Sequence, residues 1–456
     1  MIDTVRTTAI HILNRLDQSK KTLDHLLEEA FEADASLNPR DRRFLFALVF
    51  GVVRWRELLD WMISRFSKTP ISRMDDGVAN LLRLAAFQIV KMDRVPAAAA
   101  VTTAVEISKT LVKPHVTKFI NGVLRSLSRE FTTLSLPDVD NDPVVGLGVT
   151  RSFPRWLVSR WISRWGLKET TQLLDAMNQT PPLTLRVNSL KTDAHRLTRM
   201  LEEKGALVLP GNHAPGAIQV NRMRGSITDI GGFSQGYFQV QDEAAQLISH
   251  LLSPGPGEFV LDACSGLGGK TGHLAELMEN RGTLVAADVD GEKLLRLVSE
   301  MKRIGVSIIT PMKADWTTAT PPACEDRFDR VLVDAPCSGL GVIRRNPDIK
   351  WNRKPSDLKS FSKRQQLLLG RLSQWVSPGG VLVYAVCSME PEETDEVLRW
   401  FLDQHPEFMV ENIPENFSPP VRPFVDEKGC FRTFPHRHHM DGFFAARMVR
   451  GKYECG

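Results

Sequence analysis

The sequence lacks the features of several protein classes. Its six cysteines form no Cys-x-x-Cys pair and no regular disulfide framework, which argues against a small secreted domain. The longest apolar run, Phe44 to Val53, is too short to span a bilayer. The first residues lack the basic start and apolar core of a signal peptide. We therefore expect a cytoplasmic protein without a membrane segment, whose cysteines are reduced.

A strong overall charge is also missing, because the net charge is only +4 over 456 residues. The positive excess falls mainly within the first 130 residues, and a second cluster of Lys and Arg runs from 341 to 371. Local basic patches on a balanced protein favour contact with a polyanion such as RNA. A solvated helix face would give a similar pattern, so charge alone leaves both interpretations open.

The chain is too long for a single hydrophobic core, and its patterning changes along its length. Residues 1–135 repeat apolar side chains at three- and four-residue spacing, which predicts an all-α helical bundle. Residues 136–150, rich in Pro, Asp and Asn, read as a linker. Residues 151–240 predict a small α+β subdomain. In residues 241–450 apolar strands alternate with helices, which predicts a Rossmann-like α/β fold with a doubly wound, mostly parallel sheet.

Two cysteines follow the ends of two apolar strands in that last segment. Cys337 comes shortly after the strand that ends at Asp334, and Cys387 directly follows the strand from Val381 to Val386. Continuously apolar strands are typical of parallel sheets covered on both faces, and ligands bind outside the carboxyl ends of such strands. We therefore predict that Cys337 and Cys387, beside the turn that starts at Asp334, use a thiol in covalent chemistry. Free cysteines are more often small buried residues, and we expect this of the other four.

A glycine-rich loop joins the first strand of this segment to its helix. Glycines let the backbone approach a ligand, and the helix start offers free N–H groups. Asp288 ends the second strand, where such folds hold ribose hydroxyls, and Asp315 follows the third, where a helix cap is an equal alternative. These features predict a site for S-adenosyl-L-methionine, which would also involve Asp334. The loop residues are Cys264, Ser265, Gly266, Leu267, Gly268, Gly269 and Lys270.

Gly-Lys-Thr at the end of this loop is also found in the phosphate-binding loops of nucleoside triphosphatases. That pattern needs a glycine at position 264, where this chain has Cys, so we do not favour this alternative. The run from Pro435 to His439 holds three histidines, but no Cys or carboxylate stands at ligand spacing, and we expect no metal. A basic cluster with an aromatic residue follows Cys337 and predicts RNA contact, with a solvated helix approach as the alternative. Its residues are Arg344, Arg345, Lys350, Trp351 and Arg353.

Over nearly its whole length, the chain resembles the RNA 5-methylcytosine methyltransferases of the Sun type. The motifs that carry the resemblance are Asp334–Ser338, Tyr384–Ser388, Glu390–Glu393, Val240–Ala244 and Asp441–Ala445. The N-terminal bundle resembles the NusB-like RNA-binding domain through Arg40–Arg42, Leu48–Gly51 and Phe119–Arg125. One departure is that Ser265-Gly266-Leu267 stands where the family usually carries Ala-Ala-Pro, which adds backbone freedom to the loop and bears on cofactor affinity.

The resemblance implies a reaction and a role for each site residue. Cys387 would add to carbon 6 of cytosine, which activates carbon 5 toward the methyl group of S-adenosyl-L-methionine. Cys337 would help to remove the carbon 5 proton and release the product, and Asp334 would bind the base edge. The target base must be unpaired or flipped out. The implied substrate is small-subunit ribosomal RNA, bound by a monomer. Alternatives are a transfer RNA methyltransferase and a non-catalytic RNA-binding ribosome-assembly factor.

Overall fold

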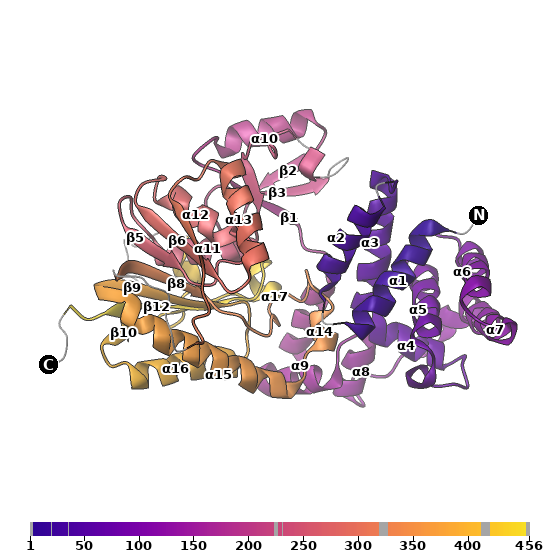
Figure 1. Cartoon of the computed structure of the whole chain (residues 1–456). Helices are drawn as coiled ribbons and strands as arrows, with labels where there is room; N and C mark the ends of the chain where they lie inside the picture. The colour runs from indigo at the N-terminus through magenta and orange to yellow at the C-terminus, as the bar shows by residue number, and fades with distance from the viewer. Residues whose placement is uncertain are drawn as a thin grey trace. The chain divides into compact units, whose positions relative to one another are not determined.

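The computed structural model describes residues 3–19, 21–34, 36–222, 227–229, 231–318, 327–411 and 420–452. It divides into two compact units, which Figure 1 shows with their helices and strands labelled. The first unit comprises residues 1–179 and 343–352, and the second comprises 180–342 and 353–456. Among the described residues, no helix combines the length and the apolar character needed to cross a membrane.

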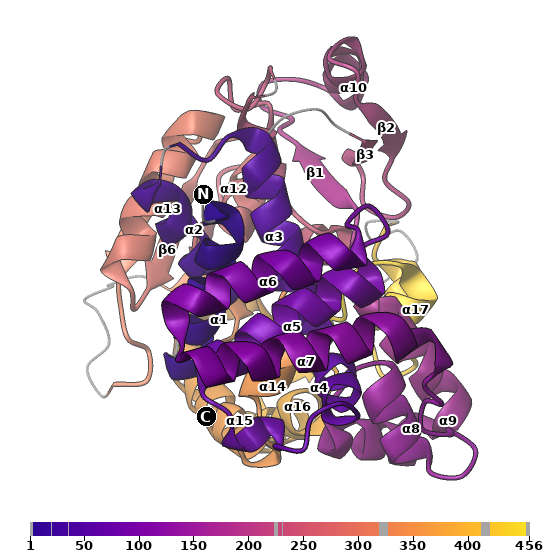
Figure 2. The same cartoon turned by 90° about the vertical axis from the view of Figure 1, so that its right-hand side faces the viewer.

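The first unit is built entirely from helices. Its long helices are α1 (Thr4–Gln18), α2 (Leu23–Ala33), α3 (Pro39–Arg54), α4 (Arg56–Ser64), α5 (Asp76–Lys91), α6 (Ala97–Leu111), α7 (Pro114–Glu130), α8 (Pro143–Thr150) and α9 (Arg155–Asn178). Local signals fix their starts: the Asn38 side chain accepts the N–H groups of Arg40 and Asp41, and Pro39 occupies the first turn of α3. The apolar stripes of α1 to α7 pack into one core. Figure 2 shows α6 and α7 side by side.

Two segments in this unit differ from the sequence-based expectation. Residues 143–150, predicted as part of a linker, form α8, which buries Leu147 and Val149. Helix α9, predicted to open the α+β subdomain, groups with the first unit in the contacts of this structure, and the start of the subdomain stays a prediction. Short-range patterning could not assign α9, because the apolar stripe of a helix indicates that it is buried but not against which partner.

The second unit contains two sheets. The smaller sheet is antiparallel with strand order β2-β3-β1-β4, and helix α10 (Ala194–Glu203) packs on it. Its strands are β1 (Leu183–Val187), β2 (Leu207–Pro210), β3 (Ala217–Arg222) and β4 (Phe238–Val240). Leu185, Leu197, Leu201 and Phe238 are fully buried in its own core.

The larger sheet is mostly parallel, and its strand order is β10-β12-β9-β8-β5-β6-β7, with β11 paired to β12. Its strands are β5 (Phe259–Asp262), β6 (Thr283–Asp288), β7 (Ile309–Lys313), β8 (Phe328–Asp334), β9 (Val376–Val386), β10 (Phe408–Val410), β11 (Cys430–Arg432) and β12 (Phe444–Arg450). The strands β7, β6, β5, β8 and β9 run parallel, while β10, β11 and β12 are antiparallel to their neighbours. The predicted Rossmann-like α/β fold is confirmed.

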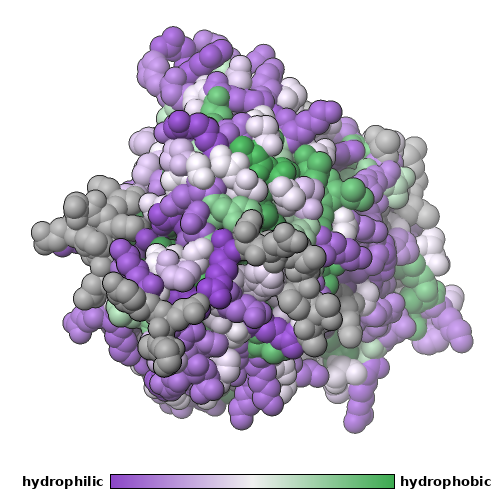
Figure 3. Space-filling view, turned by 60° about the vertical axis from the view of Figure 1, so that its left-hand side comes forward, coloured by the Kyte–Doolittle hydropathy of each residue, from purple (hydrophilic) through white to green (hydrophobic). Residues whose placement is uncertain are grey.

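Helices cover both faces of this sheet, as Figure 1 shows. One face holds α11 (Glu243–Leu252), α12 (Gly269–Leu277) and α13 (Gly291–Ile304), and the other holds α15 (Pro355–Leu372) and α16 (Asp395–Gln404). Successive residues of each strand enter opposite cores, as Val260 and Leu261 do on β5. This explains why the inner stretches of the central strands, such as Val331–Val333 of β8 and Val381–Val386 of β9, are continuously apolar. The face shown in Figure 3 is largely hydrophilic, with a limited apolar area.

A buried arginine joins the small sheet to the start of α12. Arg186 on β1 is 1% exposed, and it donates to the carbonyl oxygen of Gly269 at 2.6 Å and to Glu276 at 2.8 Å. It also donates to the side chains of Gln239 and Gln241. A buried guanidinium group requires this number of acceptors. The small sheet therefore helps to fix the first turn of α12, which follows the glycine-rich loop.

Candidate active site

The structure brings the two thiols of the sequence analysis together at one edge of the large sheet. Strands β8 and β9 are parallel neighbours, and Asp334 at the end of β8 pairs with Ala385. The turn after β8 is fastened to β9, because Gly341 N–H donates to the carbonyl oxygen of Cys387 at 3.0 Å. The Sγ atoms of Cys337 and Cys387 are 3.3 Å apart, and both thiols are free. Parallel pairing thus delivers both sulfur atoms to the crevice where such sheets bind ligands.

The surroundings of Cys337 hold its thiol in the protonated form. The hydrogen bond to Cys387, followed by burial, raises the pKa of Cys337 well above its ordinary value. Cys337 therefore keeps its proton at neutral pH and can donate it in a hydrogen bond to the sulfur of Cys387.

A lysine–aspartate pair lies beside these thiols. Lys270 Nζ is 2.6 Å from Asp334 Oδ2, and the two side chains are 12% and 29% exposed. Burial would lower the pKa of Lys270, but Asp334 and, to a smaller degree, Cys387 outweigh burial, and the pKa is raised. Lys270 belongs to the glycine-rich loop by sequence. Its ammonium group stays charged next to the Asp334 carboxylate and within electrostatic reach of Cys387.

Glu393 is a site residue whose place the sequence analysis did not predict. Its carboxylate is 0% exposed and accepts hydrogen bonds from the Ser338 N–H at 2.7 Å, from the Ser388 hydroxyl at 2.6 Å and from the Ser338 hydroxyl. Gln365 Nε2 donates to it at 3.2 Å. Burial raises the pKa of Glu393, and these four donors oppose that rise. Ser338 and Ser388 directly follow the two cysteines, so one carboxylate ties both cysteine motifs together. The only sequence signal was Glu390–Glu393, quoted above as a family motif.

The glycine-rich loop connects β5 to α12 at the same edge of the sheet. Gly266 and Gly268 have φ angles of +55° and +87°, which favour glycine. A Cβ at Gly268 would meet Leu297 and Met301 at 2.9 Å, whereas a Cβ at Gly266 would meet no atom within 4 Å. Gly268 is therefore required by packing inside the unit. Gly266 leaves open space at the loop surface, where a ligand could lie against the backbone.

Acidic and hydroxyl groups around this loop fit a ligand that carries a ribose. Asp288, at the end of β6, accepts the Gly266 N–H at 2.9 Å and is part-buried. Ser265 Oγ is buried and has no hydrogen-bond partner among the described residues. An unsatisfied buried hydroxyl calls for a further partner, which a bound cofactor would supply. Loop and acid thus suit a nucleoside-containing cofactor such as S-adenosyl-L-methionine.

Three further residues near this edge of the sheet are Asp262 at the end of β5, Cys264 in the loop and Asp315 after β7 (Ile309–Lys313). Burial raises the pKa of Asp262, at the end of β5, to about 7, and Thr271 Oγ1 donates to it at 2.7 Å. Burial raises the pKa of Cys264 well above its ordinary value, so this thiol is unreactive at neutral pH. Asp315 accepts the N–H and hydroxyl groups of Thr317 at 2.9 and 2.6 Å. These bonds close a local turn at residues 315–318, and no helix begins at Asp315 among the described residues, so the helix-cap alternative is not borne out; a cofactor contact of Asp315 stays a prediction.

The basic cluster after Cys337 is divided between two settings. Lys350 is 0% exposed in the first unit, where its ammonium group donates to the Arg54 carbonyl oxygen at 2.7 Å and lies 4.0 Å from the Phe153 ring centroid. The prediction that Lys350 contacts RNA is wrong, because its side chain is fully buried and bonded to a carbonyl oxygen of the helical unit. Trp351 Nε1 likewise donates to the Val53 carbonyl oxygen at 2.7 Å.

Of the other basic residues, Arg344 is 5% exposed, which contradicts its predicted RNA contact, whereas Arg345 and Arg353 keep that contact as a prediction. Arg353 belongs to the second unit and donates to the Ser338 carbonyl oxygen at 2.8 Å, so it also braces the turn that carries Cys337. Arg344 and Arg345 lie in the segment that packs with the first unit, as does Trp351. Local sequence does not reveal long-range contacts of this kind, because the residues adjacent to a lysine in the chain do not show whether its side chain is buried.

Comparison with known proteins follows the same division of the chain. A family model described as "16S rRNA methyltransferase RsmB/F" matches residues 249–449, and the NusB family model matches residues 3–129. A model of the ferredoxin-like domain of RsmF/B-like methyltransferases matches residues 153–226. The "Probable ribosomal RNA small subunit methyltransferase B" of Synechocystis is 34% identical over 98% of this chain and 99% of its own length. The chain belongs to the RsmB/F family of 16S rRNA methyltransferases.

Other relatives of this RsmB/F family member agree over the same length. The protein of the same name from Bacillus subtilis is 35% identical over 97% of this chain and 98% of its own length. A solved structure titled "Crystal Structure of PH0851" is 29% identical, with a TM-score of 0.82, and the match covers 98% of this chain and 99% of that chain. The predicted membership of the Sun-type family and the NusB-like character of the N-terminal domain are confirmed. The chain is thus a methyltransferase of the rRNA-modifying class.

Proposed function

We propose that this protein uses S-adenosyl-L-methionine to form 5-methylcytosine in small-subunit ribosomal RNA, through a covalent bond between Cys387 and the base. The observation that carries the proposal is the pair of thiols 3.3 Å apart beside the Lys270–Asp334 ion pair. The glycine-rich loop lies after β5, which is the parallel neighbour of β8. A methyl donor on the loop and a base on the thiols would therefore share one edge of the sheet.

The first step is the attack of the Cys387 thiolate on carbon 6 of cytosine. A sulfur–carbon bond forms, and the electron pair of the 5,6 double bond moves toward carbon 5, which becomes nucleophilic. Only the thiolate attacks well, and nearby positive charge and hydrogen bonds stabilise it. Lys270 supplies the positive charge, and the protonated thiol of Cys337 supplies the hydrogen bond.

Asp334 fits the role of selecting cytosine. Its Oδ2 atom is held by Lys270, and the side chain remains partly exposed at the crevice. A carboxylate acceptor at the base edge can bind the exocyclic amine of cytosine. Uracil has a carbonyl oxygen at that position, so it would leave two acceptors facing each other. Mismatches of this kind discriminate strongly, because buried polar groups are left unpaired.

The cofactor would be held by the backbone of Gly266 to Gly268, by the Ser265 hydroxyl and by Asp288. When bound, S-adenosyl-L-methionine supplies an electrophilic methyl group on a sulfonium ion. Cys387 and Asp334 would position the base so that its carbon 5 faces this methyl group. Family membership supports the use of this cofactor, since the matched model describes methyltransferases.

Release of the product requires removal of the carbon 5 proton and cleavage of the bond between the Cys387 sulfur and carbon 6. The largest cause of the raised pKa of Cys337 is its hydrogen bond to Cys387. Once the Cys387 sulfur is bonded to carbon 6 it carries no charge, so Cys337 can lose its proton to water. The Cys337 thiolate then takes the proton from carbon 5, the 5,6 double bond re-forms, and the Cys387 thiolate leaves. In this scheme the two thiols act in sequence, because the Cys387 sulfur must be bonded to carbon 6 before Cys337 removes the carbon 5 proton.

Two substitutions test this scheme with in vitro transcribed small-subunit rRNA. Cys387→Ala should reduce methyl transfer by more than about 10³-fold, because no other nucleophile is in place. Cys337→Ala should accumulate a protein–RNA adduct that survives denaturing gel electrophoresis. Cys430→Ala, which removes a thiol buried elsewhere in the unit, is the matched control and should retain activity. Normal product release by the Cys337 variant would refute the assigned roles.

The base and the RNA class are tested separately. Bisulfite mapping of the methylated rRNA should find a cytosine protected at one position after incubation with wild-type enzyme. Parallel assays on a transfer RNA pool should give little product. Strong transfer to that pool would instead favour the transfer RNA alternative, while loss of Cys387 without any effect on cell function would favour the non-catalytic assembly factor.

A further inference from the structure

We propose that a groove between α6 and α7 in the first unit binds the sugar–phosphate backbone of the rRNA substrate. The groove has a volume of about 840 Å³ and is lined by residues 98–106 of α6 and 118–129 of α7. All of its lining residues belong to the first unit. The inference rests on the proposed function in one respect, since it takes the rRNA substrate as the ligand.

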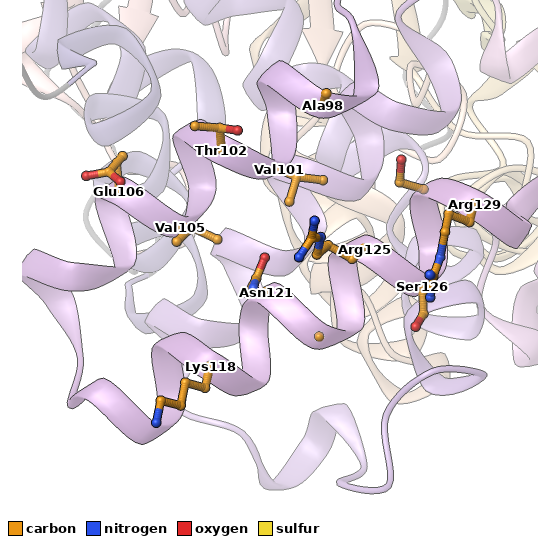
Figure 4. Close-up of a pocket in the computed structure, with 12 residues that line it drawn as sticks. Ala98, Val101, Thr102, Val105, Glu106, Lys118, Asn121, Arg125, Ser126 and Arg129 are labelled. Carbon is orange, nitrogen blue, oxygen red and sulfur yellow. The ribbon is translucent and has the colours of Figure 1, made fainter.

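Three cations on α7 give the groove its charge. Lys118, Arg125 and Arg129 are all exposed, and no described residue is recorded in an ion pair with any of them. Their spacing of seven and four residues places them on one face of the helix. In Figure 4 Lys118 and Arg129 lie toward the two ends of the groove, with Arg125 between them. This face therefore presents a row of positive charges about 16 Å long at a rise of about 1.5 Å per residue.

The carboxylate that also lines the groove does not cancel this row. Glu106 on α6 pairs with Lys109 on the same helix at 2.5 Å. The remaining polar groups are hydrogen-bonding side chains of small size, namely Thr102, Asn121, Ser126 and Ser128. Arginine, lysine, asparagine and serine are the side chains that contact phosphate and sugar oxygens in protein–nucleic acid complexes. The described residues that line the groove include no aromatic side chain, so base stacking is not expected there.

A glycine in the middle of the row lets a backbone approach closely. Gly122 lies between Lys118 and Arg125 on the same face of α7, and a Cβ there would meet nothing within 4 Å. Glycine in a helix interior is unfavourable, and internal packing does not require it here. A ligand that comes close to the helix surface does provide a reason. Charge and shape therefore point to the same ligand, a polyanionic strand lying along α7.

The test uses full-length protein and in vitro transcribed small-subunit rRNA, with binding measured in the absence of methyl donor. The triple variant Lys118→Gln, Arg125→Gln and Arg129→Gln should bind up to about 100-fold more weakly at 0.15 M salt, which is the effect of losing three phosphate contacts. The slope of log affinity against log salt should fall by about 2 to 3. Because binding is measured without catalysis, the result is independent of the proposed chemistry.

Two further variants separate charge from shape and control for net charge. Gly122→Leu keeps every charge but fills the groove, and it should weaken rRNA binding at least tenfold while thermal stability is unchanged or higher. The control Lys68→Gln, Arg73→Gln and Arg94→Gln removes three exposed cations of the same unit outside the groove and should leave the affinity within about twofold. Wild-type rRNA affinity in both groove variants would overturn the proposal and leave the groove to a protein partner.

Discussion

Replacing the buried carboxylate of Glu393 tests whether it positions the two cysteines. Glu393→Gln keeps the shape of the side chain, and its one remaining oxygen can still accept the Ser338 N–H and the Gln365 amide. The new amide group then faces the hydroxyls of Ser338 and Ser388, which must turn to accept instead of donate. Two charge-assisted hydrogen bonds, each worth about 1.5–3 kcal/mol, are replaced by neutral ones of about 0.5–1.5 kcal/mol. We expect the free energy of unfolding to fall by about 2 kcal/mol.

The effect on catalysis should exceed that loss of stability. Ser338 and Ser388 each follow one of the two cysteines of the proposed mechanism, so repositioning them should move both sulfur atoms. A misplacement on the order of 1 Å can slow an enzyme about 10²-fold. We expect kcat on rRNA to fall by roughly that factor, with little change in KM, because the groove and the cofactor loop are not touched. The ratio of the alkylation rates of Cys337 and Cys387, measured by mass spectrometry, should also differ from that of the wild type.

A matched control separates position from stability. Glu258→Gln disturbs a carboxylate at the opposite end of β8, where Glu258 binds Arg330 Nε at 2.6 Å and Nη2 at 2.9 Å. Because this pair is partly exposed, the variant should lower stability by about 1 kcal/mol or less and leave kcat within about twofold. If Glu393→Gln lowered stability while kcat and thiol reactivity stayed at their wild-type values, Glu393 would be a structural residue only and our reasoning would be refuted.

Two other predictions follow from titratable side chains that are buried or partly buried in the second unit. Lys270→Met should slow methyl transfer by about 10²- to 10³-fold and slow alkylation of Cys387, because it removes the positive charge beside the thiolate and leaves Asp334 unpaired; wild-type rates of both would contradict this role. Burial lowers the pKa of His250 to about 4 and that of His273 well below its usual value, while unfolded histidines titrate near 6.5. The unfolded chain therefore binds more protons between pH 6.5 and 4, and stability should fall as pH drops through that window, by up to about 1.4 kcal/mol per pH unit for each ring. Denaturant titrations of His250→Gln with His273→Gln should lack this part of the slope, and parallel pH curves for variant and wild type would show the assignment to be wrong.

Much of the fold was determined by local sequence. Helices with apolar stripes and a side-chain cap, such as α3 after Asn38, could be predicted because their signals lie within a few residues. The same holds for strands with a continuous apolar run, such as Val331–Val333 in β8 and Val381–Val386 in β9. The same logic placed Cys337 and Cys387 at one edge of the sheet. Parallel strands end together, so residues just beyond their carboxyl ends converge whatever the rest of the chain does.

Only the tertiary structure decided which polar groups share a partner. Lys350 and Arg353 follow the same motif three residues apart, yet one is buried in the helical unit and the other braces the Cys337 turn. Glu393 binds Ser338 across fifty-five positions, a pairing that no spacing rule specifies. An apolar pattern predicts that a segment is buried. The partner of a buried charge depends instead on which distant donors the assembled fold brings within about 3 Å. The sequence therefore determined the elements and the edge where the chemistry lies, and the packed chain determined how that edge is held and charged.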